Sequence, residues 1–341
     1  MIPRLSICIP IYNCADYIGQ ALDSILPQAK DGVEVVVFDG GSTDGTESLL
    51  SEYAANWRNL TYHRAAQKGG IDADLATCVD LSSGDYCWLF SGDDVMRPGA
   101  IQKAIDQISR GYDAYICEHT ICDKTMRVLR EYPVFAPDIP IHGDLSNREF
   151  RESWFQRAQS TEAFFRFMSS LVIRRQKWQA GRMIPEFSRS CWAHVARFFD
   201  LIPSGLRVCY VPEIWLDQRG GNDSFLHGGL VKRYEIAIDG YDRLAAKFFG
   251  EQSLERREIS RVLRREFTLR MFLLAKLYCW EDPDKESKEK LNGLVGRSHG
   301  GQSAYDRTVR FAYWATPVFA VRIARYFWIR SHKNSSLQKS T

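Results

Sequence analysis

The chain has 341 residues, of which 45% are hydrophobic and 26% are charged, a composition typical of a globular protein with a substantial core. Its nine cysteines follow no paired spacing, which favours reduced thiols in a cytoplasmic protein over a disulfide framework. The sequence shows neither a signal-peptide core nor an uncharged apolar run of the ~18–20 residues that a membrane-spanning helix needs. We therefore expect one large domain or two moderate ones, without a spanning segment.

Positive charge is concentrated towards the end of the chain. The net charge is +3, yet residues 305–341 carry seven arginine or lysine residues against one aspartate, a net charge of +6. The first 304 residues therefore carry a net charge of −3. A nucleic-acid partner is not expected, because most of the protein is acidic and no recognition motif is present.

Short apolar runs alternate with helical periodicity through the first 118 residues. The runs, which are typical of buried strands, lie at residues 5–11, 33–38, 60–64, 86–90 and 114–118. This alternation predicts parallel βαβ units and an α/β fold. Gly, Ser, Thr or Asp recurs at the strand ends and helix starts, where such residues can cradle a nucleotide diphosphate. Neither G-x-G-x-x-G nor a Walker loop is present, which disfavours dinucleotide and P-loop folds.

Two adjacent carboxylates, Asp93 and Asp94, follow the apolar run at residues 86–90. They would lie at the carboxyl end of a strand, where open α/β sheets form their ligand crevice. Neighbouring carboxylates repel each other unless a cation offsets the charge. Hard oxygen ligands of this kind suit Mg²⁺ or Mn²⁺, which usually also bind substrate phosphates. The alternative is a solvated Gly-Asp-Asp turn.

Three segments with polar ends occur in order, at residues 8–13, 37–46 and 84–94. They read Cys-Ile-Pro-Ile-Tyr-Asn, Val-Phe-Asp-Gly-Gly-Ser-Thr-Asp-Gly-Thr and Gly-Asp-Tyr-Cys-Trp-Leu-Phe-Ser-Gly-Asp-Asp. Together they resemble the nucleotide-binding half of the family 2 glycosyltransferases, which have the GT-A fold, over residues 5–110. The resemblance implies a Rossmann-like, mostly parallel central sheet flanked by helices. It also implies an inverting sugar transfer from a nucleoside-diphosphate donor with a divalent metal, Mn²⁺ or Mg²⁺.

The resemblance assigns the nucleotide site to the ends of the first two strands. The residues concerned are Pro10, Tyr12 and Asn13, which would line the base pocket, Asp39, which would bind the base or ribose, and Ser42 and Asp44, which would border the same cleft. On their own residue types, Asp39 and Asp44 could equally be turn or cap residues. Pro10 could equally be a structural stop.

The third segment matches the family's D-x-D motif with one departure. Asp93 corresponds to the last acid and would be the metal ligand, while Asp94 corresponds to the further acid near the donor sugar or acceptor and is a catalytic candidate. The first acid of the motif is Ser91 in this chain, followed by Gly92. A serine hydroxyl can hydrogen-bond a ribose but brings no charge to a metal, so weaker metal binding is expected.

Two later segments supply the remaining candidates. Family members commonly have a Glu-Asp pair whose Asp is the general base, and Ala193-His194 stands at that place. A histidine near its ordinary pKa is a competent base at neutral pH. His194 is therefore predicted to be catalytic, with a solvent-facing helix histidine as the alternative. Asp200 and Asp217 are reserve candidates for the same role.

Arg219 and Asn222 follow paired short strands predicted at residues 208–216. Many family members have an arginine-rich loop at this point that closes over the diphosphate. A guanidinium can bind phosphate oxygens bidentately, and Asn222 could add a hydrogen bond. The alternative is a glycine-rich hairpin turn with an exposed arginine.

The change to helical periodicity divides the chain into two predicted domains. Residues 1–227 would form the GT-A catalytic domain, with nucleotide-sugar binding in 1–118 and the acceptor side in 119–227. Within the acceptor side, residues 119–160 are expected to be irregular. Residues 228–341 would form a helical C-terminal region. Within it, residues 305–333 combine aromatic residues with arginines, which predicts a basic amphipathic segment lying in a membrane surface. A helix pair packed on the catalytic domain is the alternative.

The predicted protein is an inverting glycosyltransferase that moves a sugar from a nucleoside-diphosphate sugar to a hydroxyl of a glycan or polyprenyl-linked saccharide. Bacterial lipopolysaccharide (O-antigen) or capsule assembly is the expected setting, at the inner face of the cytoplasmic membrane. A homo-oligomer is compatible with the sequence. The alternatives are a non-catalytic sugar-nucleotide-binding protein and a sugar nucleotidyltransferase. The latter would need a glycine-rich loop with Arg or Lys after the first strand, where this chain has Pro-Ile-Tyr-Asn.

Overall fold

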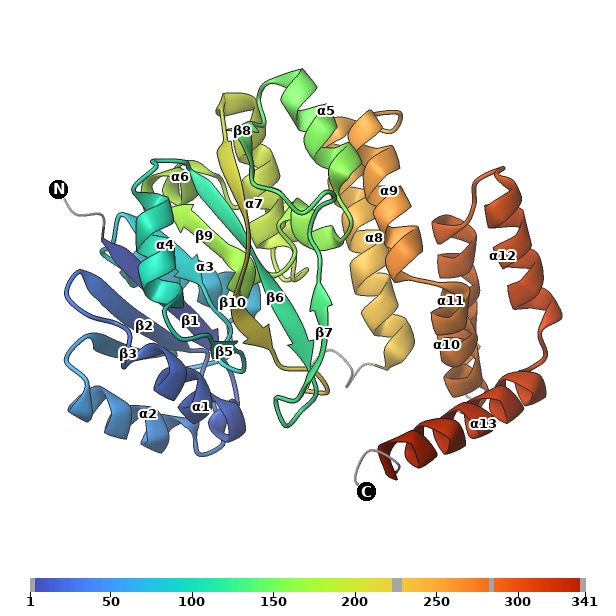
Figure 1. Ribbon diagram of the computed structural model, residues 1–341, viewed down its shortest axis with the longest axis horizontal. Helices are drawn as coiled ribbons and strands as arrows, with labels where there is room; N and C mark the ends of the chain where they lie inside the picture. Colours follow the sequence, from blue (N-terminus) through green and yellow to red (C-terminus); the bar gives the residue numbers. More distant parts are fainter. Residues whose placement is uncertain (1–3, 223–228, 282–284, 338–341) are drawn as a thin grey trace. The chain divides into compact units, whose positions relative to one another are not determined.

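The computed structural model describes residues 4–222, 229–281 and 285–337, and gives only the backbone of 285–287, 328–329 and 331–337 (Figure 1). The chain forms two compact units. The first unit comprises Met1–Asp223 with Ala246–Glu258, and the second unit comprises Ser224–Ala245 with Ile259–Thr341.

A ten-stranded sheet forms the centre of the first unit. Its strands are β1 (Leu5–Ile11), β2 (Val33–Asp39), β3 (Leu60–Arg64), β4 (Tyr86–Leu89), β5 (Val95–Met96), β6 (Ala114–Cys122), β7 (Val128–Tyr132), β8 (Ile141–Asp144), β9 (Leu171–Arg174) and β10 (Arg207–Gln218). Their order is β3-β2-β1-β4-β9-β6-β10-β5, with β7 beside β6 and β8 beside β10. The α/β fold expected from the sequence is confirmed.

The sheet is parallel only in part. Strands β3, β2, β1 and β4 run parallel, as do β6 and β10. Strand β9 is inserted antiparallel between β4 and β6, and β5, β7 and β8 also pair antiparallel. The nucleotide-binding half is therefore parallel as expected, whereas the rest of the sheet is mixed.

Helices connect and cover the strands of the first unit. In chain order they are α1 (Ala15–Ile25), α2 (Thr46–Asn56), α3 (Ile71–Leu81), α4 (Ala100–Ile108), α5 (Arg148–Arg157), α6 (Arg175–Ala180) and α7 (Ala193–Leu201). The 3₁₀ turn η2 (Met168–Ser170) directly precedes β9. Helices α8 (Leu230–Phe249) and α9 (Leu254–Glu266) run through both units.

Two expectations about the middle of the chain were wrong. The paired short strands predicted at residues 208–216 are one strand, β10, whose pairing with β6 shifts register between Val211 and Ile214 and again before Leu216. Residues 119–160, expected to be irregular, contain β7, β8 and α5. This part of the chain is regular because β7 and β8 pair with β6 and β10 and so join the sheet.

The core lies on both faces of the sheet. Alternate residues of β1 (Leu5, Ile7, Ile9 and Ile11) pack with α1 and α4 in one buried cluster. On the other face, α3 contacts β1 and β2, and the Cys78 thiol lies 3.2 Å from the Val36 carbonyl. Trp88 of β4 is fully buried and donates to the Ser169 carbonyl at 2.8 Å. Burying a large apolar side chain stabilises a fold by roughly 2–3 kcal/mol, so this core anchors the strand ends that carry the site.

The second unit is helical. Besides its parts of α8 and α9, it contains α10 (Leu269–Glu281), α11 (Lys285–Ser298), α12 (Ala304–Ala315) and α13 (Val318–Leu337). Helix α10 packs against α11, α12 and α13, with Phe272 and Leu277 fully buried. Among the residues that the structure describes, no helix has both the length and the apolar character to span a bilayer.

Candidate active site

The loops after β1 and β2 are bonded to each other. Asn13 adopts a positive φ of 50°, which a non-glycine residue rarely does. Its backbone N–H donates to Ser42 Oγ at 2.8 Å, and its side-chain Oδ1 accepts from the Thr43 N–H at 2.8 Å. The structure thus brings together Asn13 and Ser42, two predicted site residues from different strand ends.

Asp39, at the end of β2, is completely buried. Its Oδ1 accepts from the backbone N–H and the hydroxyl of Ser42, at 2.8 and 2.6 Å, and its Oδ2 accepts from the Tyr62 hydroxyl at 3.0 Å. The Arg64 guanidinium lies 3.5 Å from Oδ2. These contacts hold the Ser42 loop in place, and the binding of the base or ribose by Asp39 stays a prediction.

Asp44 connects the first turns of two helices. Its Oδ2 accepts from the Ala15 N–H of α1 at 3.1 Å, and its Oδ1 accepts from the Thr46 N–H of α2 at 3.0 Å. Burial raises the pKa of Asp44, but hydrogen bonds from Thr46 and Ala15 outweigh that effect and hold the pKa below its usual value. An anionic carboxylate is favoured at a helix N-terminus, so Asp44 acts as a shared cap of α1 and α2.

The remaining nucleotide-side candidates lie beside residues that the sequence did not single out. Pro10 is buried within β1, in register with Phe38 of β2, and its contact with the base stays a prediction. Tyr12 is 37% exposed, and Lys68 Nζ lies 3.7 Å from the centre of its ring. Tyr12 therefore offers an accessible aromatic face next to a cation.

Asp74, on the first turns of α3, is a further carboxylate on this side of the site. It is 4% exposed, and a side chain at either Gly40 or Gly69 would collide with its carboxylate oxygens. Burial and the charge of Asp39 raise the pKa of Asp74 to about 6. Gly40 and Gly69 are the feature of the sequence that could have pointed to Asp74, because glycines leave the space that this carboxylate fills.

Asp93 lies just beyond β4 and is half-buried. Its Oδ1 accepts from the Ser91 hydroxyl, and its Oδ2 accepts from the Asn222 amide at 2.5 Å. Gly92 is packed against the end of β1, because a Cβ atom there would collide with Ile11. The structure thus brings Ser91, Asp93 and Asn222 together, although Asn222 is 129 residues away in the sequence.

Cys14 links this strand end to the nucleotide side. Its thiol donates to the Gly92 carbonyl at 3.4 Å, and its N–H donates to Thr46 Oγ1 at 3.0 Å. Burial, followed by the charges of Asp93 and Asp44, raises the pKa of the Cys14 thiol to about 12. The loops after β1, β2 and β4 therefore meet at one place, as the carboxyl ends of neighbouring parallel strands should.

Asp94 is only 1% exposed. Its Oδ2 accepts from the Ser169 hydroxyl at 2.6 Å, and its Oδ1 accepts from the Arg219 N–H at 3.0 Å. Burial and the neighbouring Asp93 raise the pKa of Asp94 well above its usual value. Asp94 thus holds Ser169 and the Arg219 backbone in place, and its catalytic role stays a prediction.

Arg219 follows β10 and reaches across to α1. Its guanidinium donates to the backbone carbonyls of Asp93 and Lys124, at 2.8 and 2.7 Å, and to the Gln20 side chain at 2.5 Å. It also lies 5.1 Å from the centre of the Tyr17 ring. Arg219 thus lies beside the Asp93 backbone, and its donors are directed at protein oxygens in this arrangement.

His194 lies in the first turn of α7 and is half-buried. Its Nε2 lies 3.1 Å from the Arg166 carbonyl, and a carbonyl can only accept, so Nε2 carries the proton and Nδ1 keeps the lone pair. Burial lowers the pKa of His194, and the nearby Asp72 carboxylate opposes that shift. Asp72 accepts from the backbone N–H groups of Cys191 and Ala193, which fixes the start of α7.

One short segment connects His194 to the acidic pair. Arg166, whose carbonyl meets His194, is three residues before Ser169, which bonds to Asp94 and to the Ser91 N–H. The reserve candidates are engaged elsewhere: Asp200 pairs with Arg182, and Asp217 pairs with Arg97. Unlike these two carboxylates, which are held in ion pairs, His194 has a backbone carbonyl as its hydrogen-bond partner.

Metal ligation would depend mainly on Asp93. Across residues 4–222, 229–281 and 285–337, no group of three or more His, Cys, Asp or Glu side chains is arranged to hold a metal ion. Beside Asp93 lie the Ser91 hydroxyl and the Asn222 side chain, whose amide nitrogen faces the carboxylate. One carboxylate with neutral oxygens fits a Mg²⁺-type ion that takes its other ligands from water and substrate phosphates.

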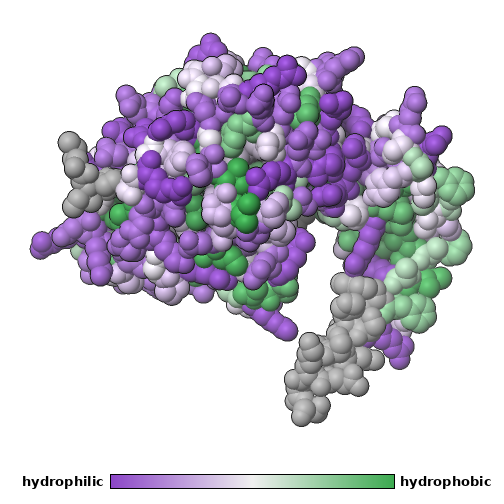
Figure 2. Space-filling model, turned by 45° about the horizontal axis from the view of Figure 1, so that its top comes forward, coloured by the Kyte–Doolittle hydropathy of each residue, from purple (hydrophilic) through white to green (hydrophobic). Residues whose placement is uncertain are grey.

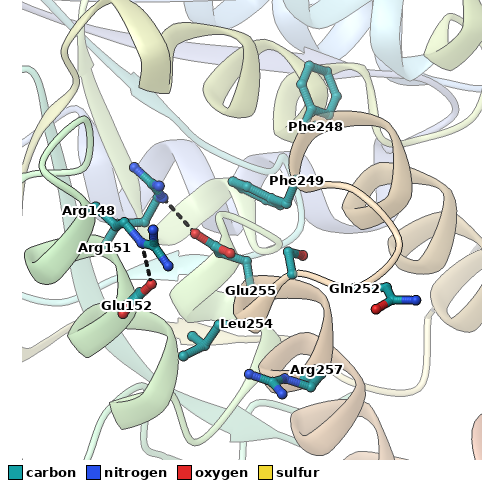
Figure 3. A pocket seen from close by; sticks show the side chains of 10 residues that line it. Arg148, Arg151, Glu152, Phe248, Phe249, Gln252, Leu254, Glu255 and Arg257 are labelled. Atoms are coloured by element: carbon teal, nitrogen blue, oxygen red, sulfur yellow. Dashed lines mark hydrogen bonds and ion pairs between the residues drawn. The ribbon is translucent and has the colours of Figure 1, made fainter.

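A separate pocket of about 540 Å³ lies between α5 and the turn that joins α8 to α9. Figure 3 shows that Arg151 pairs with Glu255, at 2.7 Å, and Arg148 with Glu152, at 2.8 Å. None of the predicted site residues lines this pocket. Two of its three arginines, Arg148 and Arg151, are engaged in these pairs, so we place the candidate active site at Asp93 instead.

Two solved structures with bound nucleotide sugars share the architecture of this chain. S. aureus TarS 1–349 in complex with UDP-GlcNAc has a TM-score of 0.58 and 14% identity, and the match covers 94% of this chain and 92% of that chain. The mannosyltransferase PcManGT from Pyrobaculum calidifontis, in complex with GDP-Man and Mn²⁺, has a TM-score of 0.50 and 16% identity over 95% and 87% of the two chains. These similarities establish the GT-A fold.

Sequence comparison gives the family. The model of glycosyl transferase family 2 matches residues 6–174. Abequosyltransferase RfbV from Salmonella typhimurium is 26% identical over 329 residues, which are 95% of this chain and 98% of that protein. Chondroitin synthase from Escherichia coli is 35% identical over 109 residues, 32% of this chain but 16% of that protein.

The chain belongs to glycosyl transferase family 2 and is a glycosyltransferase. Asp39, Asp93 and Asp94 lie inside the residues that the family model matches, whereas His194 and Arg219 lie beyond them. The enzyme class is therefore established, and the roles of the individual residues remain predictions.

Proposed function

We propose that the protein is an inverting glycosyltransferase that moves a sugar from a nucleoside-diphosphate sugar to a hydroxyl of a glycan or polyprenyl-linked saccharide. Assembly of a bacterial surface polysaccharide, O-antigen or capsule, is the proposed setting. Two similarities support this proposal: RfbV matches nearly end to end, and the solved neighbours carry UDP-GlcNAc or GDP-Man.

The observation that carries the proposal is the meeting of three strand ends at Asp93. The loops after β1 and β2 are joined to the end of β4 through Cys14. Arg219 from the end of β10 bonds to the Asp93 backbone. A carboxylate and a guanidinium side by side at the carboxyl edge of a parallel sheet suit a metal-bound diphosphate.

A divalent cation, Mn²⁺ or Mg²⁺, is the proposed cofactor, held by Asp93 with Ser91 and Asn222 nearby. When bound, the cation would neutralise charge on the departing nucleoside diphosphate, an effect of several kcal/mol. Arg219 would contribute in the same way if its guanidinium turned from the Gln20 and Lys124 oxygens to the phosphates. Because only one carboxylate would hold the metal, we expect the metal to bind tightly only when the nucleotide is also bound.

His194 is the proposed general base. In a single in-line displacement, the acceptor oxygen forms a bond to the anomeric carbon while the bond to the nucleoside diphosphate breaks, which inverts the configuration. The acceptor proton passes to Nδ1 of His194, since Nε2 is bound to the Arg166 carbonyl. Base catalysis of this kind typically contributes about 10²–10⁴-fold.

The domain and location assignments belong to the same proposal. Residues 1–227 form the catalytic domain and residues 228–341 a helical region that associates with the inner face of the cytoplasmic membrane. The net charge of +6 on residues 305–341 supports this location, since cytoplasmic membrane surfaces are anionic. A homo-oligomer stays a prediction from sequence.

The test is incubation of the full chain with UDP-, GDP-, CDP- and dTDP-sugars, in Mn²⁺ or in EDTA, with and without membrane-extracted acceptor. We expect one donor to release its nucleoside diphosphate, faster with Mn²⁺ and faster again with acceptor. NMR of the product should show an inverted anomeric configuration. A donor that binds but never turns over, even with acceptor, would indicate a non-catalytic binding protein instead.

A further inference from the structure

The solvent-facing side of α13 carries a row of large apolar residues. Phe319, Ile323, Tyr326 and Phe327 are 68%, 53%, 58% and 62% exposed. Their spacings of four and three place them on one face of the helix. Val321, which is 9% exposed, lies on the opposite face. This helix therefore directs apolar residues away from the unit to which it belongs.

Helix α12 also directs apolar side chains towards the solvent. Phe311 and Trp314 are 74% and 59% exposed, whereas Val309 and Tyr313 are 4% and 1% exposed. Apolar side chains thus cover its outer face as well as its inner one. Figure 2 shows hydrophobic residues gathered at the surface of the C-terminal helices, on the right of the view. Apolar surface of this extent on a folded protein usually marks an interaction site.

Arginines flank this apolar face. Arg322 and Arg330 are exposed, and Arg322 lies 3.5 Å from Glu281 at the end of α10. Arg330 donates to the Tyr326 hydroxyl at 3.3 Å, so cation and aromatic ring project together. The single acidic residue of the sequence between 305 and 341, Asp306, is 5% exposed. The charge that α12 and α13 present is therefore positive.

We propose that the outer faces of α12 and α13 form a docking surface for an anionic lipid bilayer, with both helices lying flat in the headgroup region. Aromatic rings would enter the boundary between headgroups and acyl chains, and the arginines would bind lipid phosphates. We call Phe311, Trp314, Phe319, Ile323, Tyr326 and Phe327 the docking face. The inference rests on the proposed function in one respect, because it places the enzyme where a polyprenyl-linked acceptor would be found.

Charge decides between a bilayer and a second copy of the chain. In a symmetric dimer the same patch would meet itself, so the arginines of the two copies would lie close together. The one acidic residue of α12 and α13 that could pair with them is Asp306, and its side chain is buried. Like charges at close range repel, and an interface needs complementary potentials. An anionic bilayer supplies the opposite charge and an apolar layer at once, which matches both features of the docking face.

The test is flotation of the full-length protein with two kinds of vesicle, pure phosphatidylcholine and phosphatidylcholine with about a third phosphatidylglycerol. We expect binding to the anionic vesicles that weakens with added salt, and little binding to the neutral ones. An Arg322→Gln/Arg330→Gln variant should bind the anionic vesicles about fivefold less tightly for each arginine removed. Equal binding of this variant and the wild type would contradict the role of charge.

The apolar contribution is tested with Phe319→Gln/Ile323→Gln/Phe327→Gln. All three side chains are more than half exposed, so the variant should fold normally and lose vesicle binding about a hundredfold. The matched control is Val128→Gln/Leu129→Gln on β7, which replaces residues that are 51% and 61% exposed and should float like the wild type. Flotation of the triple variant at the wild-type level would overturn the proposal.

Two further outcomes have defined meanings. If the wild type ignores both kinds of vesicle but sediments as a dimer that the triple variant abolishes, the face binds a second copy and the membrane inference fails. Nucleotide release measured without lipid separates this inference from the proposed function. A protein that turns over its donor but never floats overturns the docking face and the membrane location, and leaves the sugar transfer intact. One that floats but turns over no donor overturns only the enzymatic proposal.

Discussion

The two sides of the active site hold their polar side chains in different ways. On the nucleotide side, Asp39 is fully buried and accepts three hydrogen bonds, and Asn13 and Ser42 are bonded to each other. On the reacting side, Asp93 and His194 are only half-buried. Asp93 bonds to two side chains, and His194 keeps a lone pair on Nδ1 because Nε2 meets a carbonyl.

This difference separates residues that build the site from residues that can act in it. A buried carboxylate whose oxygens are all bonded contributes to the shape and stability of the loops, and its loss leaves protein donors unpaired. A half-buried group with an available lone pair can take a proton or a metal. Substitutions on the nucleotide side should therefore cost stability, whereas substitutions on the reacting side should cost rate.

The largest effect is expected for His194→Ala. Loss of the base should lower kcat by about 10²–10⁴-fold with little change in donor KM, measured as nucleoside diphosphate release with acceptor present. His142→Ala, at an exposed position on β8, is the control and should keep wild-type rates. Because burial lowers the pKa of His194, the wild-type kcat should hold below about pH 6.5 and fall only once the ring is protonated. Unchanged kcat in the variant would remove His194 as the base.

Asp93→Asn should be next in size. The amide keeps the shape of the side chain but removes the charge that a metal needs, and a loss of a few kcal/mol corresponds to about 10²-fold in rate. We expect the Mn²⁺ concentration for half-maximal activity to rise together with this loss. Asp106→Asn, at an exposed position of α4, is the matched control. The free energy of unfolding should change by less than about 0.5 kcal/mol; a much larger loss would place Asp93 with the structural residues.

Asp39→Ala tests the other side of the comparison. It leaves the Ser42 N–H, the Ser42 hydroxyl and the Tyr62 hydroxyl without their acceptor, so the free energy of unfolding should fall by about 3 kcal/mol. Tyr62→Phe removes one donor and should cost about 1 kcal/mol. Urea denaturation measures both. If Asp39→Ala unfolds like the wild type but no longer binds the nucleotide, Asp39 is a direct ligand and not a positioning residue.

The last prediction concerns His119 of β6, whose ring is fully buried and has its centre 4.5 Å from that of Phe167 and 5.3 Å from that of Tyr132. Burial and the charge of Arg166 lower the pKa of His119 to about 3. A histidine with a lowered folded pKa stabilises the fold fully above about pH 6.5, and this contribution falls by about 1.4 kcal/mol per pH unit on acidification towards pH 3.

His119→Phe should remove this pH dependence. From pH 7 to pH 5 the wild type should lose about 2 kcal/mol of unfolding free energy through this residue, and the variant should retain it. Urea titrations at the two pH values measure the difference. An equal loss in both proteins would show that another group titrates on unfolding.

The sequence by itself was sufficient for the parallel half of the sheet and for the position of Asp93. Apolar runs and helical spacing are local properties, and the strands predicted at residues 5–11, 33–38 and 60–64 are β1, β2 and β3 within one residue. A carboxylate directly after a buried strand must lie at that strand's carboxyl end. This placement follows from chain connectivity alone, so the Asp93 motif and the apolar run before it predict the same position.

Only the tertiary structure decided which side chains have atoms available for chemistry. Asp39 and Asp94 are enclosed by partners from other elements, and Arg219 is bonded to Gln20, 199 residues away in the sequence. Strand β9 enters the sheet antiparallel for a similar reason, because its pairing depends on β4 and β6 rather than on its own residues. Burial and hydrogen bonding are set by neighbours distant in sequence, and those neighbours cannot be identified from local pattern.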